Sequence, residues 1–466
     1  MKGMTLSAVA KAVNGSYHGP QENLDREITG ACFDSRKLVK NGLFFATKGE
    51  RTNGHKFLPQ VYENGALCCV VERELTEQDL PEGVKLEQVS YIVVADSFIA
   101  IRRLAMFYRK SLPVKVVGVT GSVGKTSTKE MIAAVLSAKF KVFKTEANHN
   151  NILGLSMMIF SLRPEHEVAV LEMGISDFGE MALLASVARP DIGVITNIGQ
   201  CHLENLGDRD GILLAKTEFF GYLPKDGRVV LNGNDDKLAA ISLVAGQPPV
   251  FFNDDKTCYA DHVVSRGLLG TECVIHTPEF DVSASIPVPG AHQILNAMAA
   301  VRVGQLLGMT KEQIEEGIRN TETIKGRGKV METPLFTLID DAYNANPVSM
   351  MAGLRLLSEA DTRTVAILGD MFELGTDERA LHRGVGEGMK QEGIAPDVLI
   401  CIGDLAGEIY EGAGGSCEKY HYPDRDSFLK EGIRHLAKGD TILLKASHGM
   451  AFDALVKALE GKTSLE

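Results

Sequence analysis

Residues 114–129 of the chain read VKVVGVTGSVGKTSTK, and this stretch decides the fold of the segments around it. Its β-branched first half favours a strand, and the apolar residues Met131, Ile132 and Val135 that follow have the spacing of one helix face. The two glycines between strand and helix allow backbone N–H groups to approach phosphates, and the helix N-terminus adds partial positive charge. The stretch therefore predicts a strand, a phosphate-binding loop and a helix, which together form a nucleotide site.

One position of this loop departs from the common phosphate-loop pattern. The pattern places a glycine six residues before the lysine, whereas this chain has Val119 there, so the loop is the shortened form G-x-x-G-K-T. We expect Lys125 to neutralise the β- and γ-phosphates and the Thr126 hydroxyl to hold Mg²⁺. A plain glycine turn before an ordinary helix is the alternative interpretation. The residues predicted to surround the phosphates are Gly121, Ser122, Val123, Gly124, Lys125, Thr126 and Ser127.

The composition limits the class of protein. A length of 466 residues is enough for about three domains, and the 44% of hydrophobic residues can form a core in each. The formal charge of −12 argues against a nucleic-acid-binding protein. The eight cysteines include no C-x-x-C pair, which is typical of reduced intracellular proteins, and no apolar run reaches the length of a membrane span. We therefore expect a cytoplasmic protein that is not inserted in a membrane.

Three units are predicted along the chain, at residues 1–95, 96–328 and 329–466. The first is a small mixed α/β domain, with short apolar strands and a helix near residues 54–64. In the second, strands such as residues 166–172 alternate with helices, which favours a mostly parallel sheet covered on both faces. The third repeats this alternation without a phosphate loop, and its loops LGDMFELG and KASHGM are expected to act as a substrate lid. The fold class is therefore α/β, with a P-loop domain in the centre.

Polar residues at strand ends are the candidates for chemistry, because the ligands of parallel sheets bind at the carboxyl ends of the strands. Glu172 ends the apolar strand VAVLE, and a carboxylate there suits Mg²⁺. His202, in TNIGQCHLENLG, is a candidate for a second metal position, although a loop histidine is more often a surface group. Lys216 lies between apolar neighbours on a predicted helix. Its spacing alone favours a lysine whose aliphatic chain packs on the protein while its ammonium stays at the surface.

Further polar residues lie at the predicted junctions and loops. Asn296 on a helix, Arg327 between the second and third units, and Asp341 at another strand end are within reach of a nucleotide, and Arg327 is a natural γ-phosphate clamp. The run Asp34-Ser35-Arg36 suits a diphosphate or a base edge, or else it is a solvated turn. The amide-rich loop at residues 147–151, which contains Asn150 and Asn151, suits sugar or phosphate oxygens but also a plain turn.

Together these motifs resemble the Mur ligase family along nearly the whole chain. The matching features are the early DSR…GLFFATKGE…GH run, the loop TGSVGKTSTKE, the amide loop NHNN…G, and the run from Glu172 through His202 to Lys216. The resemblance implies a uridine-nucleotide-binding first domain, a central ATPase and a Rossmann-like third domain that binds the incoming amine. The segments DAYNANPVSM and LGDMFELG resemble motifs of one branch of this family. Enzymes of that branch join D-alanyl-D-alanine to UDP-N-acetylmuramoyl-tripeptide through an acyl phosphate.

The resemblance also implies roles for individual residues. Lys125 and Thr126 would bind the ATP phosphates and magnesium, and Glu172 and His202 would hold two Mg²⁺ ions. Lys216 would be N-carboxylated and become a further metal ligand. Lys125, His202, Lys216 and Arg327 would serve catalysis, Asn296 and Arg327 would contact the nucleotide, and Asp341 would contact its ribose. The residues implied to bind substrate are Asp34, Ser35, Arg36, Asn150, Asn151, Tyr343, Asn344 and Asn346. The segment KASHGM stands where KGSRGM is common in the family, so His448 takes the place of an arginine. This difference leaves the details of dipeptide binding open.

Three other interpretations remain at this point. Another amide ligase of the same superfamily is the nearest, although the early DSR motif argues against a folylpolyglutamate synthetase. A P-loop kinase or nucleotide switch would predict a strict phosphate-loop pattern and no large third domain. An inactive scaffold would lack Glu172 and His202, which are present. We expect a monomer that acts on small molecules.

Overall fold

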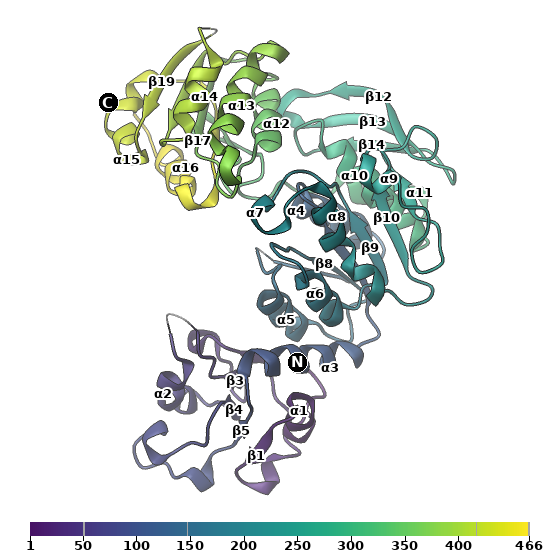
Figure 1. Ribbon diagram of the computed structural model, residues 1–466, viewed down its shortest axis with the longest axis vertical. Coiled ribbons are helices and arrows are strands. Elements are labelled where there is room, and N and C mark those ends of the chain that lie inside the picture. The colour runs from purple at the N-terminus through teal and green to yellow at the C-terminus, as the bar shows by residue number, and fades with distance from the viewer. Residues whose placement is uncertain (50–51, 147, 416, 465–466) are drawn as a thin grey trace.

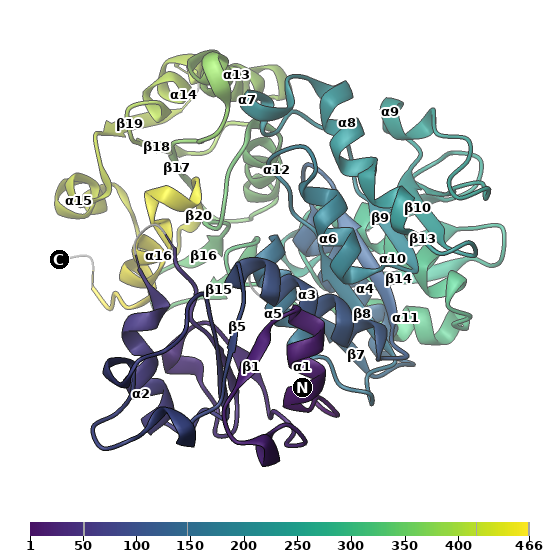
Figure 2. The same ribbon diagram turned by 60° about the horizontal axis from the view of Figure 1, so that its bottom comes forward.

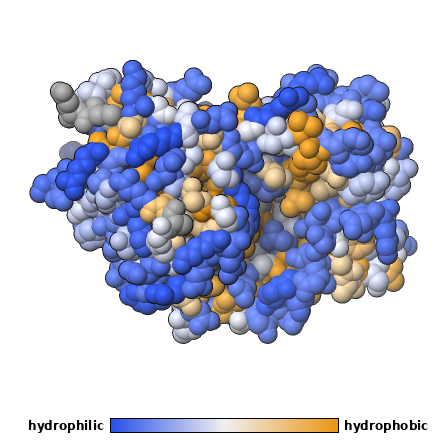
Figure 3. All heavy atoms as spheres, turned by 90° about the horizontal axis from the view of Figure 1, so that it is seen from above, coloured by the Kyte–Doolittle hydropathy of each residue, from blue (hydrophilic) through white to orange (hydrophobic). Residues whose placement is uncertain are grey.

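The computed structural model describes residues 1–49, 52–146, 148–415 and 417–464, so Ala147 of the amide-rich loop lies outside the described residues. The chain forms three successive α/β units (Figure 1). The first and third lie at opposite ends of the longest axis, with the central unit between them. Viewed along this axis, the surface is mostly hydrophilic and hollowed near its middle (Figure 3).

The first unit is built on a five-stranded sheet with the order β1-β5-β4-β3-β2. Only β1 is antiparallel to its neighbour. Strand β2, one of the short apolar strands of this unit, has only two residues, because Asp34 accepts a hydrogen bond from the Arg36 N–H and starts a 3-10 turn. The helix predicted near residues 54–64 begins with another 3-10 turn. The elements are α1 (Leu6–Val13), β1 (Ser16–His18), β2 (Ala31–Cys32), β3 (Leu43–Phe45), α2 (Leu58–Glu63), β4 (Cys68–Val71) and β5 (Tyr91–Val93).

The central unit contains a six-stranded parallel sheet with the order β11-β10-β9-β6-β8-β7. Val116 of β6 packs into one hydrophobic core and Val117 and Val119 into another, which explains why this strand is apolar on both faces. The strands are β6 (Lys115–Thr120), β7 (Val142–Lys144), β8 (Val168–Glu172), β9 (Ile192–Ile195), β10 (Arg228–Asn232) and β11 (Val250–Phe252). The helices are α3 (Ser97–Lys110), α4 (Lys125–Ser137), α5 (Ile152–Ser161), α6 (Glu180–Ala188), α7 (Leu203–Leu206), α8 (Arg209–Thr217), α9 (Asp236–Ala239), α10 (Gln293–Leu306) and α11 (Lys311–Arg319).

A second, antiparallel sheet in the central unit was not predicted. It consists of β12 (Tyr259–Ser265), β13 (Thr271–His276) and β14 (Val282–Ile286). The turn between β12 and β13 reaches the third unit, where Leu268 packs against a hydrophobic core and Ser265 Oγ donates a hydrogen bond to Glu359 Oε2 at 2.5 Å. This hairpin lies beside α12 in the ribbon view (Figure 1). It therefore fastens the second unit to the third.

The third unit has a six-stranded sheet with the order β15-β16-β20-β17-β18-β19, in which only β15 is antiparallel. Its two faces have separate cores, covered by α12, α13 and α14 on one side and by α16 on the other. The strands are β15 (Lys329–Glu332), β16 (Thr337–Asp340), β17 (Thr364–Gly369), β18 (Val398–Ile402), β19 (Glu418–Tyr422) and β20 (Thr441–Lys445). The helices are α12 (Pro347–Leu357), α13 (Glu378–Glu392), α14 (Ala406–Ala413), α15 (Arg425–Ser427) and α16 (Phe452–Glu460).

The first and central units share one hydrophobic core. Leu6 and Val9 of α1 belong to the same buried cluster as Ile101 and Leu104 of α3 and Ile159 of α5. Both ribbon views place α1 beside α3 (Figures 1 and 2). No helix in the described part of the chain is long and apolar enough to span a membrane.

Candidate nucleotide site

The phosphate loop lies between the carboxyl end of β6 and the first turn of α4, as the sequence predicts. Gly121 has φ +148°, and a Cβ there would lie 1.9 Å from Thr196 Oγ1, so this position requires glycine. The loop is braced by the segment after β9, because Asn197 accepts hydrogen bonds from the N–H groups of Ser122 and Val123 at 3.0 and 3.1 Å. The backbone of the loop is therefore preformed for an anion.

Lys125 begins α4 and turns back over the loop. Its Nζ donates hydrogen bonds to the carbonyl oxygens of Gly121 at 2.9 Å and Ser122 at 3.3 Å. Burial lowers the pKa of Lys125, and the nearby Glu172 carboxylate opposes this shift. A partly desolvated ammonium held at the mouth of a phosphate loop is well suited to bind the oxygens of a nucleotide.

Glu172 provides an anionic side chain next to this loop. It lies at the end of β8, is 2% exposed, and its Oε1 accepts a hydrogen bond from Asn150 Nδ2 at 2.8 Å. Its Oε2 is buried without a hydrogen-bond partner among the described residues. An unpaired buried carboxylate oxygen is costly unless a cation binds it, so Glu172 fits a magnesium ligand. The amide loop therefore supports Glu172 through Asn150, while Asn151 caps α5 by accepting a hydrogen bond from the Gly154 N–H.

Beyond β9, His202 immediately precedes α7, and Lys216 lies on the next helix, α8. His202 precedes α7 in a left-handed conformation with φ +50°, and burial lowers its pKa. Lys216 on α8 is 1% exposed, so the expectation of an ammonium at the surface is wrong. Burial and, to a smaller extent, the Lys125 ammonium lower the pKa of Lys216 to about 7, and among the described residues no carboxylate opposes the shift. A substantial fraction of Lys216 is therefore neutral near pH 7.

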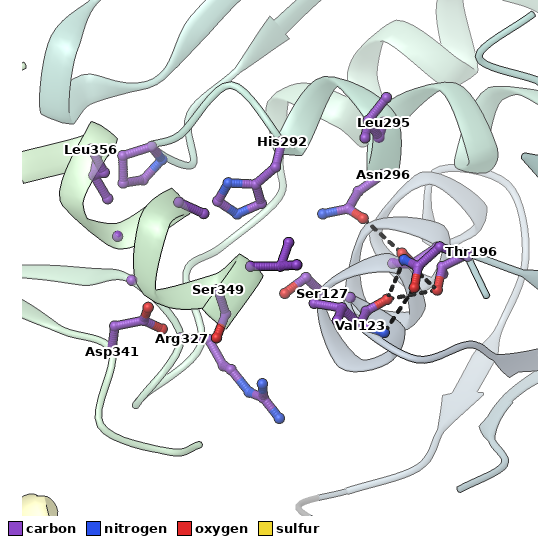
Figure 4. Close-up of a pocket in the computed structure, with 18 of the residues that line it drawn as sticks. Val123, Ser127, Thr196, His292, Leu295, Asn296, Arg327, Asp341, Ser349 and Leu356 are labelled. Carbon is purple, nitrogen blue, oxygen red and sulfur yellow. Dashed lines mark hydrogen bonds between the residues drawn. The ribbon is translucent and has the colours of Figure 1, made fainter. Parts of the chain in front are cut away.

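A cavity of about 210 Å³ adjoins the phosphate loop and lies between the central and third units. On its central side, Asn296 of α10 accepts a hydrogen bond from Thr128 Oγ1 at 2.6 Å and donates one to Gln293 Oε1 at 2.7 Å. One N–H and one lone pair of this amide remain for a ligand. Asn296 of α10 and His292, which immediately precedes this helix, face Ser349 of α12 across the cavity (Figure 4).

Arg327 links the phosphate loop to the third unit. Its Nη2 donates a hydrogen bond to Thr126 Oγ1 at 3.5 Å, and its guanidinium carbon lies 4.1 Å from the centre of the Tyr343 ring. The His448 ring is 5.7 Å from the same ring. Stacking on Tyr343 fixes the guanidinium plane beside the site of the phosphates.

The other candidate residues of the third unit take part in local structure. Asn346 Oδ1 caps α12 by accepting a hydrogen bond from the Ser349 N–H, and Asn344 Oδ1 accepts one from the Ala345 N–H. Asp341 follows β16 and lines the cavity. Its Oδ2 accepts a hydrogen bond from the buried Lys445 Nζ at 2.6 Å. Lys445 was not among the predicted residues, because nothing in KASHGM indicates a partner about a hundred positions earlier.

The candidates of the first unit lie on its own surface. Asp34 and Arg36 form a bidentate ion pair in which the Arg36 side chain is 85% exposed. The hydrogen bond from Arg36 lowers the pKa of Asp34 to about 2. Ser35 begins the adjoining 3-10 turn. The structure thus gathers Lys125, Glu172, His202, Lys216, Asn296, Arg327 and Asp341 around the phosphate loop and leaves residues 34–36 in the first unit.

Two features of this site were not identified from the sequence, the segment that braces the phosphate loop and the partner of His202. Asn197 and Gly199 brace Ser122 and Val123, and Glu373 of the third unit reaches His202. The rule that ligands bind at strand ends would have identified Asn197, which comes two residues after β9. Glu373 lies in the loop LGDMFELG, which was predicted only as part of a lid.

Comparisons with known proteins agree with the motifs. Residues 119–304 match the Mur ligase middle domain, and residues 326–448 match the Mur ligase, glutamate ligase domain. The chain is 36% identical to the UDP-N-acetylmuramoyl-tripeptide–D-alanyl-D-alanine ligase of Bacillus subtilis, over 98% of each chain.

Solved structures give the same result. A crystal structure of MurF from Acinetobacter baumannii superposes with a TM-score of 0.87 at 30% identity, covering 98% of this chain and 99% of that one. MurF from Thermotoga maritima in complex with ADP superposes with a TM-score of 0.78 at 27% identity, covering 92% and 97%.

Proposed function

The chain belongs to the Mur ligase family, and from this membership we propose that it joins D-alanyl-D-alanine to the terminal carboxylate of UDP-N-acetylmuramoyl-tripeptide in an ATP-dependent reaction. The products are UDP-N-acetylmuramoyl-pentapeptide, ADP and phosphate, so the enzyme serves peptidoglycan precursor synthesis. The observation that carries the proposal is the full-length similarity to a ligase of that name, together with a phosphate loop placed beside the buried Glu172. Full-length similarity favours this reaction over that of a folylpolyglutamate synthetase.

Each unit has a separate part in the proposed reaction. Residues 1–95 would bind the uridine diphosphate substrate through Asp34, Ser35 and Arg36. The Arg36 guanidinium is paired with Asp34, but it is exposed and its remaining N–H groups can donate to a diphosphate. Residues 96–328 would bind ATP. Residues 329–466 would bring the dipeptide to the reacting carboxylate, with Tyr343 near the junction and Asn344 and Asn346 shaping the loop around it.

Magnesium fits this site. The unpaired Oε2 of Glu172 and the Thr126 hydroxyl offer hard oxygen ligands, and His202 lies on the loop that would complete a second position. Two Mg²⁺ ions would offset the negative charge of the triphosphate and of the incoming carboxylate.

Lys216 fits N-carboxylation. An ammonium beside magnesium would be repelled, whereas a neutral amine can react with CO₂, losing a proton and gaining a carbamate with two hard oxygens. The pKa of about 7 leaves enough neutral amine for this reaction near neutrality. We propose that carboxylated Lys216 is the further ligand of the site.

The proposed chemistry has two steps. The tripeptide carboxylate attacks the γ-phosphorus, and the bond to ADP breaks to give an acyl phosphate. The dipeptide amine then attacks the acyl carbon and loses a proton, and the bond to phosphate breaks. Lys125 neutralises the phosphates, and Arg327, which stacks on Tyr343 of the third unit, clamps the γ-phosphoryl group. Closure of the third unit excludes water from the acyl phosphate.

The test is phosphate release measured with each UDP-muramoyl peptide, in the presence and absence of D-alanyl-D-alanine, with mass spectrometry of the product. We expect phosphate release only when the tripeptide substrate and the dipeptide are both present. The mass of the product should exceed that of the tripeptide substrate by the two added alanine residues. Turnover with a shorter UDP-muramoyl peptide and a single amino acid would instead identify a different ligase of the family. Comparing tripeptides that carry lysine or diaminopimelate at the third position defines the natural substrate.

A further inference from the structure

Lys445 is a buried lysine that the proposed reaction does not use. It ends β20, its side chain is 2% exposed, and it lines the nucleotide cavity. Its Nζ donates hydrogen bonds to Asp341 Oδ2 at 2.6 Å and to the Asn344 carbonyl oxygen at 3.1 Å. Burying an ammonium costs desolvation free energy, and such partners offset that cost. Lys445 is therefore a charge that the fold keeps at an energetic cost.

The ion pair is held from two sides. The parallel pairing of β16 with β20 places Asp340 opposite Leu444, which brings the next residues, Asp341 and Lys445, together. On the other side, α12 packs against the pair at Gly353. A Cβ there would lie 3.4 Å from Lys445 Cδ and 3.5 Å from Asp341 Oδ2. The hydrogen bond from the Lys445 ammonium therefore holds Asp341 Oδ2 in place, with the backbone of α12 close beside the pair.

The pair leaves one acceptor for the cavity. Lys445 engages Asp341 Oδ2, whereas Asp341 Oδ1 accepts no hydrogen bond from any described residue. Asp341 is 18% exposed and lies at the edge of the cavity, on the side opposite Asn296 (Figure 4). A carboxylate oxygen in a fixed position is a strong acceptor for a sugar hydroxyl.

We propose that Lys445 is a positioning residue that sets the ribose specificity of the nucleotide site by fixing the Asp341 carboxylate. This inference rests on the proposed function and on the resemblance to the Mur ligases, which implies that Asp341 contacts the ribose of ATP. In this arrangement Lys445 acts on the nucleotide through Asp341. Without the ammonium, the carboxylate would turn toward water and accept the ribose hydroxyl less well, whereas binding of the adenine and the phosphates would remain.

The test compares ATP with 2′-deoxy-ATP and 3′-deoxy-ATP as substrates of the full-length enzyme. We expect the wild type to prefer ATP to at least one analogue by about tenfold or more in kcat/KM, since a hydrogen bond to a charged group has about this effect. Lys445→Met and Asp341→Asn should each reduce the preference to about twofold or less. The double variant should show no further loss, because both changes remove the same contact.

The matched control is Lys419→Met, which removes another lysine of the same sheet. Lys419 of β19 donates a hydrogen bond to the Tyr410 carbonyl oxygen, away from the cavity. This control should keep the wild-type preference. If Lys445→Met lowers turnover equally with all three nucleotides and keeps the preference, Lys445 is only structural and the proposal is overturned.

Folding and the proposed function are checked separately. If circular dichroism shows that Lys445→Met is unfolded, Lys445→Gln is measured instead, because its amide still donates to the Asn344 carbonyl without the charge. A wild-type preference in Lys445→Gln overturns the proposal. A wild type that does not release phosphate from ATP contradicts the proposed function, whereas an active wild type without ribose preference contradicts only this inference.

Discussion

His202 Nδ1 lies 3.5 Å from Glu373 Oε2, which joins the loop after β9 to a loop of the third unit. Both residues have left-handed backbone conformations, with φ of +50° and +62°. Such strained conformations are typical of segments held by their surroundings. The third unit is therefore in contact with the phosphate-loop side of the central unit at this point.

Exposure limits the strength of that contact. The Glu373 side chain is 71% exposed, so the pair contributes less than about 1 kcal/mol. Glu373→Gln should lower kcat/KM for the dipeptide by less than about fivefold. Asp404→Asn, which removes another exposed carboxylate of the third unit, is the control in the same phosphate-release assay. A loss of about 100-fold would mean that Glu373 contacts substrate.

The phosphate loop gives a second prediction. Lys125→Ala should lower kcat by about 10³-fold or more, because the positive charge over the loop is lost where negative charge gathers in the transition state. Lys115→Ala, at the exposed start of β6, should keep normal turnover. Circular dichroism should show both variants folded, and near-normal turnover of Lys125→Ala would place the nucleotide elsewhere.

Carboxylation of Lys216 gives a third prediction. Lys216→Ala should be nearly inactive, and added acetate should restore part of the activity by supplying carboxylate oxygens in the vacated space. The wild type incubated with ¹³C-labelled bicarbonate should show a carbamate signal in ¹³C NMR spectra, independent of turnover. Lys216→Ala should lack this signal, and its persistence would assign the carbamate to another amine.

The lowered pKa of Lys216 gives a fourth prediction, for apo protein in bicarbonate-free buffer. The pKa is about 7 in the folded state, against 10.5 for a model lysine, so between these values the unfolded chain binds a proton that the folded chain does not. The buried amine therefore destabilises the fold fully below about pH 7, and this effect fades as the pH rises toward 10.5.

Lys216→Met should consequently raise the free energy of unfolding, by on the order of 3 kcal/mol near pH 7. Urea titrations at pH 6.5 and 9 measure the difference between the two proteins, which should be smaller at the higher pH. An equal difference at both pH values would show that the lysine is not desolvated in the folded state.

The first unit gives a fifth prediction. Arg36→Ala should raise KM for the UDP-linked substrate by about tenfold and leave KM for ATP nearly unchanged, since Arg36 lies in the first unit and not beside the phosphate loop. Arg26→Ala is the matched control, because it removes another arginine of the first unit, whose guanidinium donates hydrogen bonds to Asn23 and Asn41. An equal rise for both substrates would count against the assigned binding surface.

Local patterns predicted the parts of the site that depend on neighbouring residues. The strand, loop and helix at residues 114–129 are contiguous, so hydrophobic periodicity and glycine placement identify them directly. Glu172 was predictable because it ends an uninterrupted apolar strand. The β12–β14 sheet was not, because YADHVVS alternates poorly and β12 has mostly exposed residues.

Burial that arises from tertiary packing could not be predicted. Lys216 has the spacing of a surface lysine. Only the packing of α8 against the other elements of the central unit removes its ammonium from water. The pairing of Lys445 with Asp341 depends on the register between β16 and β20, which sequence periodicity does not specify.

The core shared by the first and central units has a consequence for synthesis of the chain. This core begins at Met1 and its last buried residue is Val244, whereas the cores of the third unit begin at Leu335 and Ile339. In a nascent chain this shared core is therefore complete only after residue 244 has left the ribosome, long after α1 has been synthesised. The buried residues of those two cores all come from residues 335–459, so they are separate from the shared core.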